Sequence, residues 1–286
     1  MGLWYDEVFE DKLRLGLKLK RTLFTGQSDF QKVEVVETEL LGKALLIDGL
    51  WMTCEGEEAP YHELIVQPAM VTSPTIERVL IIGGGDGGTA REVLRHAEVK
   101  HVDMVEIDAM VIEACKEHLP EIGTAWDDPR LNVMVGDGVA YVKEADVEPY
   151  DVVIVDGSDP VGPAKGLFNE SFYRGCARLL KEEGVFVTQS ESPRLFKEIH
   201  LEMVQVINTV FGAAWPYYYP VMIYGSGHWS WTYASRQTTP YDLNDERVAR
   251  LEKDSRIYNR GIHHGVFALP NHVKQELAEM LVKRDA

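Results

Sequence analysis

Long apolar runs, paired cysteines and an excess of positive charge are all missing from this 286-residue chain. No stretch of eighteen apolar residues occurs, so we expect no membrane-spanning helix. Its three cysteines, Cys54, Cys115 and Cys176, fit neither a disulfide framework nor a metal-binding pair, and we expect buried, reduced thiols. Residues 1–12 are too acidic and polar for a secretory signal, which predicts a cytoplasmic protein.

Positive charge is scarce, with 29 Lys and Arg against 46 Asp and Glu, a formal net charge of −17. An acidic surface repels nucleic acid phosphates and anionic lipids, and it attracts cations. Solubility alone explains the acidity equally well. The nine histidines are scattered, and the one adjacent pair, His263 and His264, has no cysteine or carboxylate partner nearby in the sequence. We therefore expect no nucleic acid, membrane or metal partner.

The first sixty residues have the composition of β-strands, and residues 1–62 are predicted to form a small N-terminal β domain. Strand-type residues at Gln31–Glu37 and Lys43–Ile47 flank a plausible hairpin turn at Leu41-Gly42, and Trp51–Cys54 is a possible third strand. A break at residues 56–60 precedes a predicted helix at residues 61–70, with Pro68 in its second half.

From residue 63 onwards the chain is predicted to form one catalytic domain, 63–286, in which strands alternate with helices. Residues 78–82 form a continuous apolar run, as expected of a strand buried on both faces. Repeated strand–helix units predict a doubly wound parallel sheet with right-handed crossovers. The remaining predicted strands are 102–107, 131–135, 150–155, 184–189 and an antiparallel edge hairpin of Tyr217–Tyr224 and Trp229–Ser235 joined through Gly225–Gly227.

A glycine loop follows the first parallel strand. Gly83, Gly85 and Gly88 match G-x-G-x-x-G, and Glu106 ends the next strand about twenty residues on, where a ribose-binding carboxylate belongs. Asp86 lies inside the loop, where its charge opposes a dinucleotide pyrophosphate but suits a cation. Asp137 ends the third strand and can accept a hydrogen bond from an adenine amino group. These acids favour an adenosyl sulfonium over NAD.

A second pair of carboxylates, Asp156 and Asp159, follows the fourth strand, at the sheet edge where open α/β sheets bind ligands. The residues after them, 160–166, contain prolines, which stiffen the backbone, and glycines, which can act as hinges. This composition suits a lid. Asx-type turns are the alternative role for the two aspartates. Facing the glycine loop, the pair predicts a cationic reactant beside a nucleoside.

The motifs GGGDGG, VEID, GDG, DGSDPVGP, YHE and HHGVFALP occur in this order over nearly the whole chain. As a set they resemble the spermidine synthase family, the aminopropyltransferases. The resemblance implies a class I methyltransferase-like Rossmann domain with a seven-stranded, mostly parallel sheet, behind an N-terminal β domain. It implies transfer of the aminopropyl group of decarboxylated S-adenosylmethionine to putrescine, giving spermidine and methylthioadenosine. It implies no tightly bound cofactor, and it implies that the chain forms a homodimer or a homotetramer.

The resemblance also implies residue roles. Asp156, Tyr61 and Tyr224 would surround the attacking amine as the catalytic residues, and Asp86 would pair with the ammonium of the aminopropyl arm. The residues implied for the donor are Gln31, His62, Gly83, Gly85, Asp86, Glu106, Asp137, Gly138, Pro163 and Leu167. Those implied for the acceptor are Trp4, Asp159, Gln189 and Trp229. Pro60 departs from the family's usual Arg-Asp-Glu-Phe run and leaves the direction of Tyr61 open.

Three alternatives remain from the sequence. The same fold serves S-adenosylmethionine methyltransferases, although Asp86 and the Asp156/Asp159 pair argue against one. The acceptor could be cadaverine, agmatine or spermidine instead, although the bulky His228, Trp229 and Trp231 suggest a short acceptor pocket. An inactive polyamine-binding protein would not need a nucleoside site as well.

Overall fold

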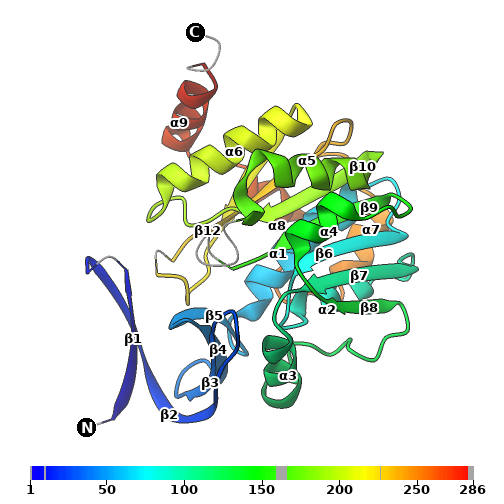
Figure 1. The fold of residues 1–286 in the computed structure, drawn as a ribbon. Coiled ribbons are helices and arrows are strands. Elements are labelled where there is room, and N and C mark those ends of the chain that lie inside the picture. Colours follow the sequence, from blue (N-terminus) through cyan, green and yellow to red (C-terminus); the bar gives the residue numbers. More distant parts are fainter. Residues whose placement is uncertain (1, 10, 159–165, 226, 283–286) are drawn as a thin grey trace.

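A computed structural model describes residues 2–9, 11–158, 166–225 and 227–282, which contain two sheets (Figure 1). The first sheet is antiparallel, and its strands pair in chain order. They are β1 (Leu3–Phe9), β2 (Leu13–Gln27), β3 (Lys32–Thr38), β4 (Lys43–Ile47) and β5 (Leu50–Cys54). The three predicted strands and the hairpin turn of β3 and β4 are confirmed. The sequence reasoning did not locate β1 and β2, although leucine alternates with other residues from Leu13 to Leu19 in a period-2 pattern.

The second sheet has seven strands in the order β11-β12-β10-β9-β6-β7-β8. Strands β6 to β10 pair in parallel, and β12 and β11 are added antiparallel at one edge. Their bounds are β6 (Arg78–Gly83), β7 (His101–Glu106), β8 (Leu131–Val135), β9 (Tyr150–Asp156), β10 (Leu180–Gln189), β11 (Ala214–Tyr219) and β12 (Trp229–Ala234). The predicted α/β class with a seven-stranded, mostly parallel sheet is confirmed.

The edge hairpin differs from its prediction. The strand predicted at residues 217–224 lies at Ala214–Tyr219 instead, and Tyr219 pairs with Trp229. Nine residues therefore connect the two strands, not a tight glycine turn. The strand begins before Pro216, which an edge strand tolerates, and it ends before the strand-type residues 221–224. The longer connection carries Tyr224 and Gly225 to the wall of the cavity described below.

Helices cover both faces of the second sheet (Figure 1). α1 and α2 pack together on one face, and α4, α5 and α6 pack in sequence on the other. The helix bounds are α1 (Glu58–Thr72), α2 (Gly88–Leu94), α3 (Ala109–His118), α4 (Gly138–Glu144), α5 (Glu170–Leu179), α6 (Lys197–Phe211), α7 (Asp245–Leu251), α8 (Arg260–Val266) and α9 (Asn271–Val282). None of the helices within these described ranges is long and apolar enough to cross a membrane.

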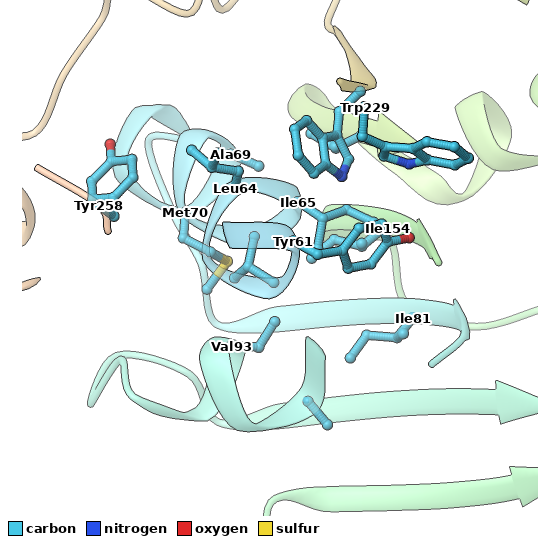
Figure 2. Packing of buried hydrophobic residues seen from close by; sticks show 14 of the residues in the cluster. Tyr61, Leu64, Ile65, Ala69, Met70, Ile81, Val93, Ile154, Trp229 and Tyr258 are labelled. Carbon is cyan, nitrogen blue, oxygen red and sulfur yellow. The ribbon is translucent and has the colours of Figure 1, made fainter. Parts of the chain in front are cut away.

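Helix α1 is buried along its whole length. Figure 2 shows Leu64, Ile65 and Met70 among core residues that include Ile81 and Ile154 of the sheet. A helix buried on every side must also satisfy its polar groups, because an unpaired buried polar atom is costly. Glu63 accepts hydrogen bonds from the backbone N–H groups of residues 256, 257 and 258 at 2.6–3.0 Å, which ties the C-terminal segment to α1.

Helix α1 contains two prolines, Pro60 and Pro68. The break predicted at residues 56–60 is wrong for residues 58–60, which belong to the helix. Pro60 lies in the first turn of the helix, where an N–H would have no intrahelical acceptor, so the helix begins at Glu58 and not at Tyr61. Pro68 cannot donate to the carbonyl of Leu64, and the hydroxyl of Tyr217 donates to that carbonyl instead, at 2.7 Å. The predicted division at residues 62 and 63 falls inside this helix and stays a prediction.

Helix α3 joins the two sheets. It follows β7 of the second sheet and packs its apolar face on β2 and β3 of the first. Val111 and Cys115 of α3 form one buried cluster with Val33, Val35 and Leu45. Burial of such side chains contributes about 25 cal/mol per Å² of apolar surface, so this cluster fixes the first sheet over the carboxyl ends of the parallel strands.

Candidate active site

A cavity lies where the first sheet faces the carboxyl ends of β6, β7 and β9. Asp86, Glu106 and Asp156 line one side, and Glu7 and Gln31 of the N-terminal region line the other. This is the edge at which parallel sheets place their ligand sites. Of the predicted site residues, those that line the cavity are Gln31, Tyr61, Gly83, Gly85, Asp86, Glu106, Asp137, Gly138, Asp156, Leu167, Tyr224 and Trp229.

The glycine loop is shaped by close approach of site residues. Gly83 has a φ of +85°, and a Cβ there would collide with the carbonyl oxygen of Asp156. A Cβ on Gly85 would lie 2.9 Å from Oε2 of Glu106, and one on Gly88 would collide with the ring of His62. The three glycines therefore bring the loop against the residues predicted to bind the donor and carry out the chemistry.

Asp156 ends β9 beside the glycine loop and receives two hydroxyl groups. Tyr61 donates to its Oδ1 at 2.7 Å, and Thr89 donates to its Oδ2 at 2.6 Å. Burial raises the pKa of Asp156, and the nearby charge of Asp86 raises it further. A carboxylate with a raised pKa is a better proton acceptor than an ordinary aspartate.

Asp86 has a different set of partners. Its Oδ2 lies 3.1 Å from Nε2 of His62, and its Oδ1 accepts the backbone N–H of Gly88 at 2.8 Å. Burial alone would raise the pKa of Asp86, but the charge and hydrogen bond of His62 outweigh it, and the pKa is lowered. An ionised carboxylate at the cavity wall suits an ammonium group.

The nucleoside side of the cavity contains two further acids. Glu106 is buried at the end of β7, and this burial raises its pKa to about 7 despite backbone hydrogen bonds from Asp108 and Gly85. Asp137 accepts the backbone N–H of Val139 at 2.8 Å and caps α4, a helix that the sequence reasoning did not find. Among the described residues, no three His, Cys, Asp or Glu side chains gather in a way that could hold a metal ion.

Gln31 is held at the cavity by the segment after β7. Its Nε2 donates to Oδ2 of Asp108 at 3.1 Å, and Ser28 donates to the same oxygen at 2.7 Å. Asp108 also caps α3 by accepting the N–H of Met110 at 2.9 Å. One carboxylate thus connects the turn before β3 with the second sheet and fixes the amide of Gln31.

An aromatic wall closes the cavity beside Asp156. The rings of Tyr61 and Tyr224 meet edge to face at 5.8 Å, and Trp229 lies 4.4 Å from Tyr224. The hydroxyl of Tyr224 donates to the carbonyl of Met52 at 2.7 Å, so this tyrosine contributes its ring to the wall while its hydroxyl anchors the loop to β5. The direction of Tyr61, left open by Pro60, is toward Asp156.

Three comparisons with known proteins bear on this site. The family model described as the spermine/spermidine synthase domain matches residues 58–245, and the one described as the spermidine synthase tetramerisation domain matches residues 3–55. The chain belongs to the spermine/spermidine synthase family. A protein of Prochlorococcus marinus named polyamine aminopropyltransferase is 46% identical over 277 residues, 96% of each chain. One of Alkaliphilus metalliredigens with the same name is 41% identical, covering 97% of this chain and 98% of its own.

Solved structures agree with this assignment. A spermidine synthase in complex with the transition state analogue AdoDATO has a TM-score of 0.93 at 38% identity, covering 96% of this chain and 95% of its own. The spermidine synthase of Thermotoga maritima has a TM-score of 0.90 at 37% identity, covering 96% and 94%. Together with the relatives, these confirm the predicted spermidine synthase family, the methyltransferase-like fold and the prediction of an aminopropyltransferase enzyme.

Some of the predicted family residues lie elsewhere. Trp4 is 59% exposed, on the face of β1 opposite to the cavity residues Glu7 and Phe9, so the structure does not bring its side chain to the site. Gln189 is buried behind the cavity, where its side chain bonds Glu191, and it does not line the wall. His62 also stands behind the wall and acts on Asp86. Asp159 and Pro163 fall outside the described residues.

Sequence reasoning missed four residues that line this cavity or hold its lining residues: Glu7, Glu58, Thr89 and Asp108. Glu58 lies four residues before His62 on one helix face, a spacing that identifies it once the helix begins early enough. Thr89 directly follows the glycine loop, but nothing in its type points to Asp156. Glu7 follows from the period-2 alternation of β1, which places it on the face opposite to Trp4.

Proposed function

We propose that this enzyme transfers the aminopropyl group of decarboxylated S-adenosylmethionine to putrescine and releases spermidine and methylthioadenosine. The observation that carries the proposal is the pair of carboxylates at neighbouring strand ends. Asp86 is ionised and held by His62, and Asp156 is a proton acceptor between two hydroxyl groups. The cationic donor needs an ionised carboxylate to bind it, and the amine acceptor needs a carboxylate that takes up its proton.

The donor would lie across the strand ends. Glu106 would accept hydrogen bonds from the ribose hydroxyls, Asp137 and Gly138 would face the adenine, and Leu167 would pack on the base. Support comes from their places in one cavity wall in the order β7, β8 and the segment after β9. A relative of known structure is a spermidine synthase solved with the transition state analogue AdoDATO, which agrees with a small-molecule substrate in this fold.

The acceptor amine must lose a proton to attack. Its pKa resembles that of lysine, about 10.4, so generating the neutral amine at pH 7 costs about 4–5 kcal/mol. In the proposed step, the amine nitrogen bonds to the terminal carbon of the aminopropyl arm, the carbon–sulfur bond breaks, and sulfur keeps the electron pair. The released proton passes to Asp156, with Tyr61 orienting its carboxylate. In-line positioning in the cavity supplies further rate acceleration.

The far end of the acceptor would face Glu7. The Glu7 side chain is buried and lines the cavity from the first sheet. Phe9 and Trp229 provide apolar walls. A diamine has an apolar middle and a cationic far end, which matches apolar walls that lead to a carboxylate. This arrangement supports a diamine of limited length.

The test is a product assay on the purified chain. It is incubated with decarboxylated S-adenosylmethionine and, separately, putrescine, cadaverine, agmatine or spermidine, and methylthioadenosine and product mass are measured. We expect methylthioadenosine with putrescine as the best acceptor. Ordinary S-adenosylmethionine serves as the matched donor control, since its extra carboxylate faces Asp86. Methyl transfer would make the chain a methyltransferase, and a better amine would correct the acceptor.

We also propose that the chain assembles into a homodimer or homotetramer. Residues 3–55 match a domain described by its role in tetramerisation, and Leu3, Trp4 and Val8 of β1 are exposed apolar side chains on a projecting hairpin (Figure 1). Light scattering that returned the monomer mass of 32.3 kDa would contradict this. Cytoplasmic location stays a prediction from the sequence.

A further inference from the structure

Helix α1 places His62 directly behind Asp86, with a carboxylate at each of its ring nitrogens. Nδ1 lies 2.8 Å from Oε2 of Glu58, one helical turn earlier, and Nε2 lies 3.1 Å from Oδ2 of Asp86. The His62 side chain is 1% exposed, so water does not compete for these contacts. Both ring nitrogens therefore face acceptor groups within the protein.

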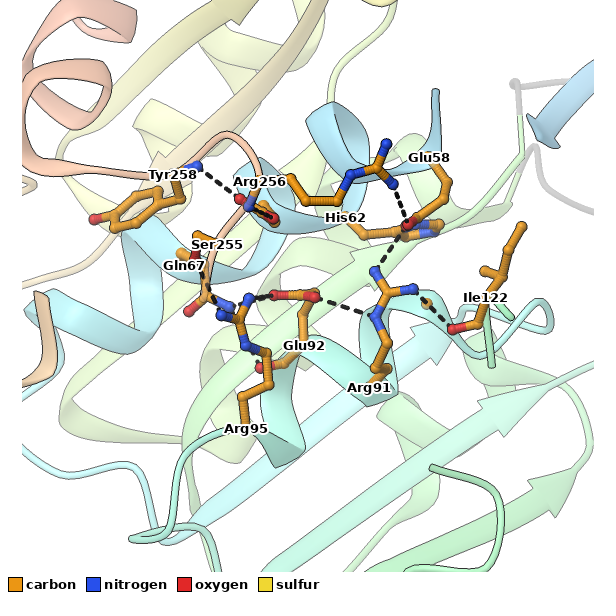
Figure 3. A network of polar contacts seen from close by, with 12 residues as sticks. Glu58, His62, Gln67, Arg91, Glu92, Arg95, Ile122, Ser255, Arg256 and Tyr258 are labelled. Carbon is orange, nitrogen blue, oxygen red and sulfur yellow. Dashed lines mark hydrogen bonds and ion pairs between the residues drawn. The ribbon is translucent and has the colours of Figure 1, made fainter. Parts of the chain in front are cut away.

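These two contacts require two ring protons. A neutral imidazole has one N–H and one bare nitrogen, and a bare nitrogen would repel the carboxylate that faces it. Glu58 does not supply the missing proton, because its Oε2 also accepts from Arg91 at 2.7 Å and Arg256 lies 3.6 Å from its Oε1 (Figure 3). Burial raises the pKa of Glu58, but His62 and Arg91 outweigh it and bring the pKa to about 2.

The protonated ring in turn fixes Asp86. His62 holds one carboxylate oxygen and the backbone N–H of Gly88 holds the other at 2.8 Å, so the carboxylate has a single orientation at the cavity wall. The ring reaches this position because Gly88 has no side chain. Glu58 contacts neither Asp86 nor the cavity, and its influence passes through His62.

We propose that Glu58 is a positioning residue of the donor site: with Arg91 it keeps His62 protonated at both ring nitrogens, and His62 keeps Asp86 ionised and facing the donor ammonium. The identity of that ammonium rests on the proposed function. Burial lowers the pKa of His62, but Asp86 and Glu58 outweigh it and raise the pKa to about 10. The groups that face His62 or its partners are Glu58, Tyr61, Asp86, Asp156, Arg91 and Arg256.

Glu58→Gln removes the charge and keeps the shape. Arg91 still needs an oxygen at the former Oε2 position, so the new amide oxygen faces both Arg91 and Nδ1 of His62. A neutral His62 must then keep its proton on Nδ1 and turn a bare Nε2 toward Asp86. The resulting repulsion displaces Asp86, and the donor loses its partner once His62 loses its second proton.

The kinetic test measures the KM for decarboxylated S-adenosylmethionine between about pH 7 and about pH 9 at saturating putrescine. In the wild type we expect a flat profile above about pH 8, where Glu106, with its pKa of about 7, is already ionised and His62 keeps its proton up to about pH 10. In Glu58→Gln we expect the KM to rise by about tenfold per pH unit above a lowered pKa of His62, with kcat at pH 7 little changed. A Glu58→Gln profile as flat as the wild type overturns the proposal.

Glu92→Gln is the matched control. Glu92 is a buried carboxylate of the same network (Figure 3). It bonds Arg91 at 3.1 Å, Arg95 at 2.7 Å and Gln67 at 2.8 Å, and these partners do not include His62. Like Glu58→Gln, the Glu92→Gln variant loses a negative charge and weakens a contact with Arg91. Any general loosening of the network should therefore affect both variants. Above about pH 8 we expect the donor KM of Glu92→Gln to stay independent of pH, as in the wild type. The same rise in Glu92→Gln would overturn the specific role of Glu58.

A second measurement reads the wild-type protein directly and needs no turnover. Nitrogen-15 NMR of histidine-labelled wild-type protein at about pH 8 should show both ring nitrogens of His62 protonated, with the signal assigned by its loss in His62→Gln. One bare ring nitrogen overturns the proposal. If the wild type shows the doubly protonated ring but releases no methylthioadenosine, the positioning of Asp86 stands and the proposed reaction falls.

Discussion

Two aspartates stand at neighbouring strand ends of one cavity, and the protein gives them opposite acid strengths. Asp86 is held by His62 and a backbone N–H, and its pKa is lowered. Asp156 receives two neutral hydroxyl groups, and its burial and the charge of Asp86 raise its pKa. Both are partly buried, and burial raises the pKa of each, so burial alone does not separate them. The charge of the partner decides which carboxylate is more readily ionised, and under the proposed function the ionised one binds the cation and the other accepts the proton.

The largest expected effect comes from Asp156→Asn. An amide cannot accept the proton, so we expect kcat to fall by about 10²- to 10⁴-fold in the methylthioadenosine assay. In the wild type, activity should be lost as pH falls through the raised pKa of Asp156. Asp151→Asn is the control, since Asp151 is a buried carboxylate on the same strand whose partners Thr75 and Lys181 lie away from the cavity. A near-normal kcat in Asp156→Asn would remove its role.

Asp86→Asn should act on binding more than on chemistry. Loss of a charge-assisted hydrogen bond to the donor ammonium costs about 1.5–3 kcal/mol, which raises the donor KM by about 10- to 100-fold. Initial rates at varied donor and fixed putrescine measure this change, and thermal unfolding verifies the fold, because His62 loses its partner. A fall in kcat with an unchanged donor KM would show that the two aspartates do not divide the work as inferred.

Thr89→Val tests the hydroxyl environment of Asp156 without touching Asp86. In the wild type, the hydrogen bond from Thr89 at 2.6 Å lowers the pKa of Asp156. The variant lacks this hydrogen bond, so its Asp156 has a higher pKa. We expect kcat to fall by about tenfold and the acid limb of the kcat profile to move to higher pH. Thr89→Ser should restore both. A Thr89→Val profile with an unmoved acid limb would limit Thr89 to packing.

The smallest expected effect concerns stability. The pKa of Glu106 in the folded state is about 7, above its usual 4.5, so between these values the folded state holds a proton that the unfolded state has released. Stability therefore falls as pH rises from about 4.5 to about 7 and stays low above that. We expect Glu106→Gln to raise the free energy of unfolding by about 1–2 kcal/mol at pH 8 and by little at pH 4. Equilibrium denaturation at the two pH values decides, and an equal effect at both would exclude a titrating Glu106.

The positions of the site's acidic residues were largely predictable from the sequence alone. Buried strands followed by glycine or acid locate Asp86, Glu106, Asp137 and Asp156 at one sheet edge, because parallel strands end on the same side. The strand β11 was misplaced because it begins before Pro216, which an edge strand tolerates, and ends before the strand-type residues 221–224. Trp4 was assigned by its type and position in a motif, whereas alternation along β1 puts Glu7 on the cavity face.

The supporting residues were not predictable in the same way. Tyr61 and Asp156 are 95 residues apart, and Thr89 and Asp156 are 67 apart, so no local spacing records these hydrogen bonds. Glu58 was excluded because Pro60 indicated a break, although the first turn of a helix accepts proline. Asp108 combines a local helix cap with a contact to Gln31 that only the packing of α3 on the first sheet creates.

The sequence by itself determined the fold and the positions of the acids, because hydrophobic period and glycine placement act over a few neighbouring residues. Only the tertiary structure decided what each acid does. Asp86 and Asp156 have the same side chain, and their ionisation depends on whether a cation or a hydroxyl from a distant segment approaches them.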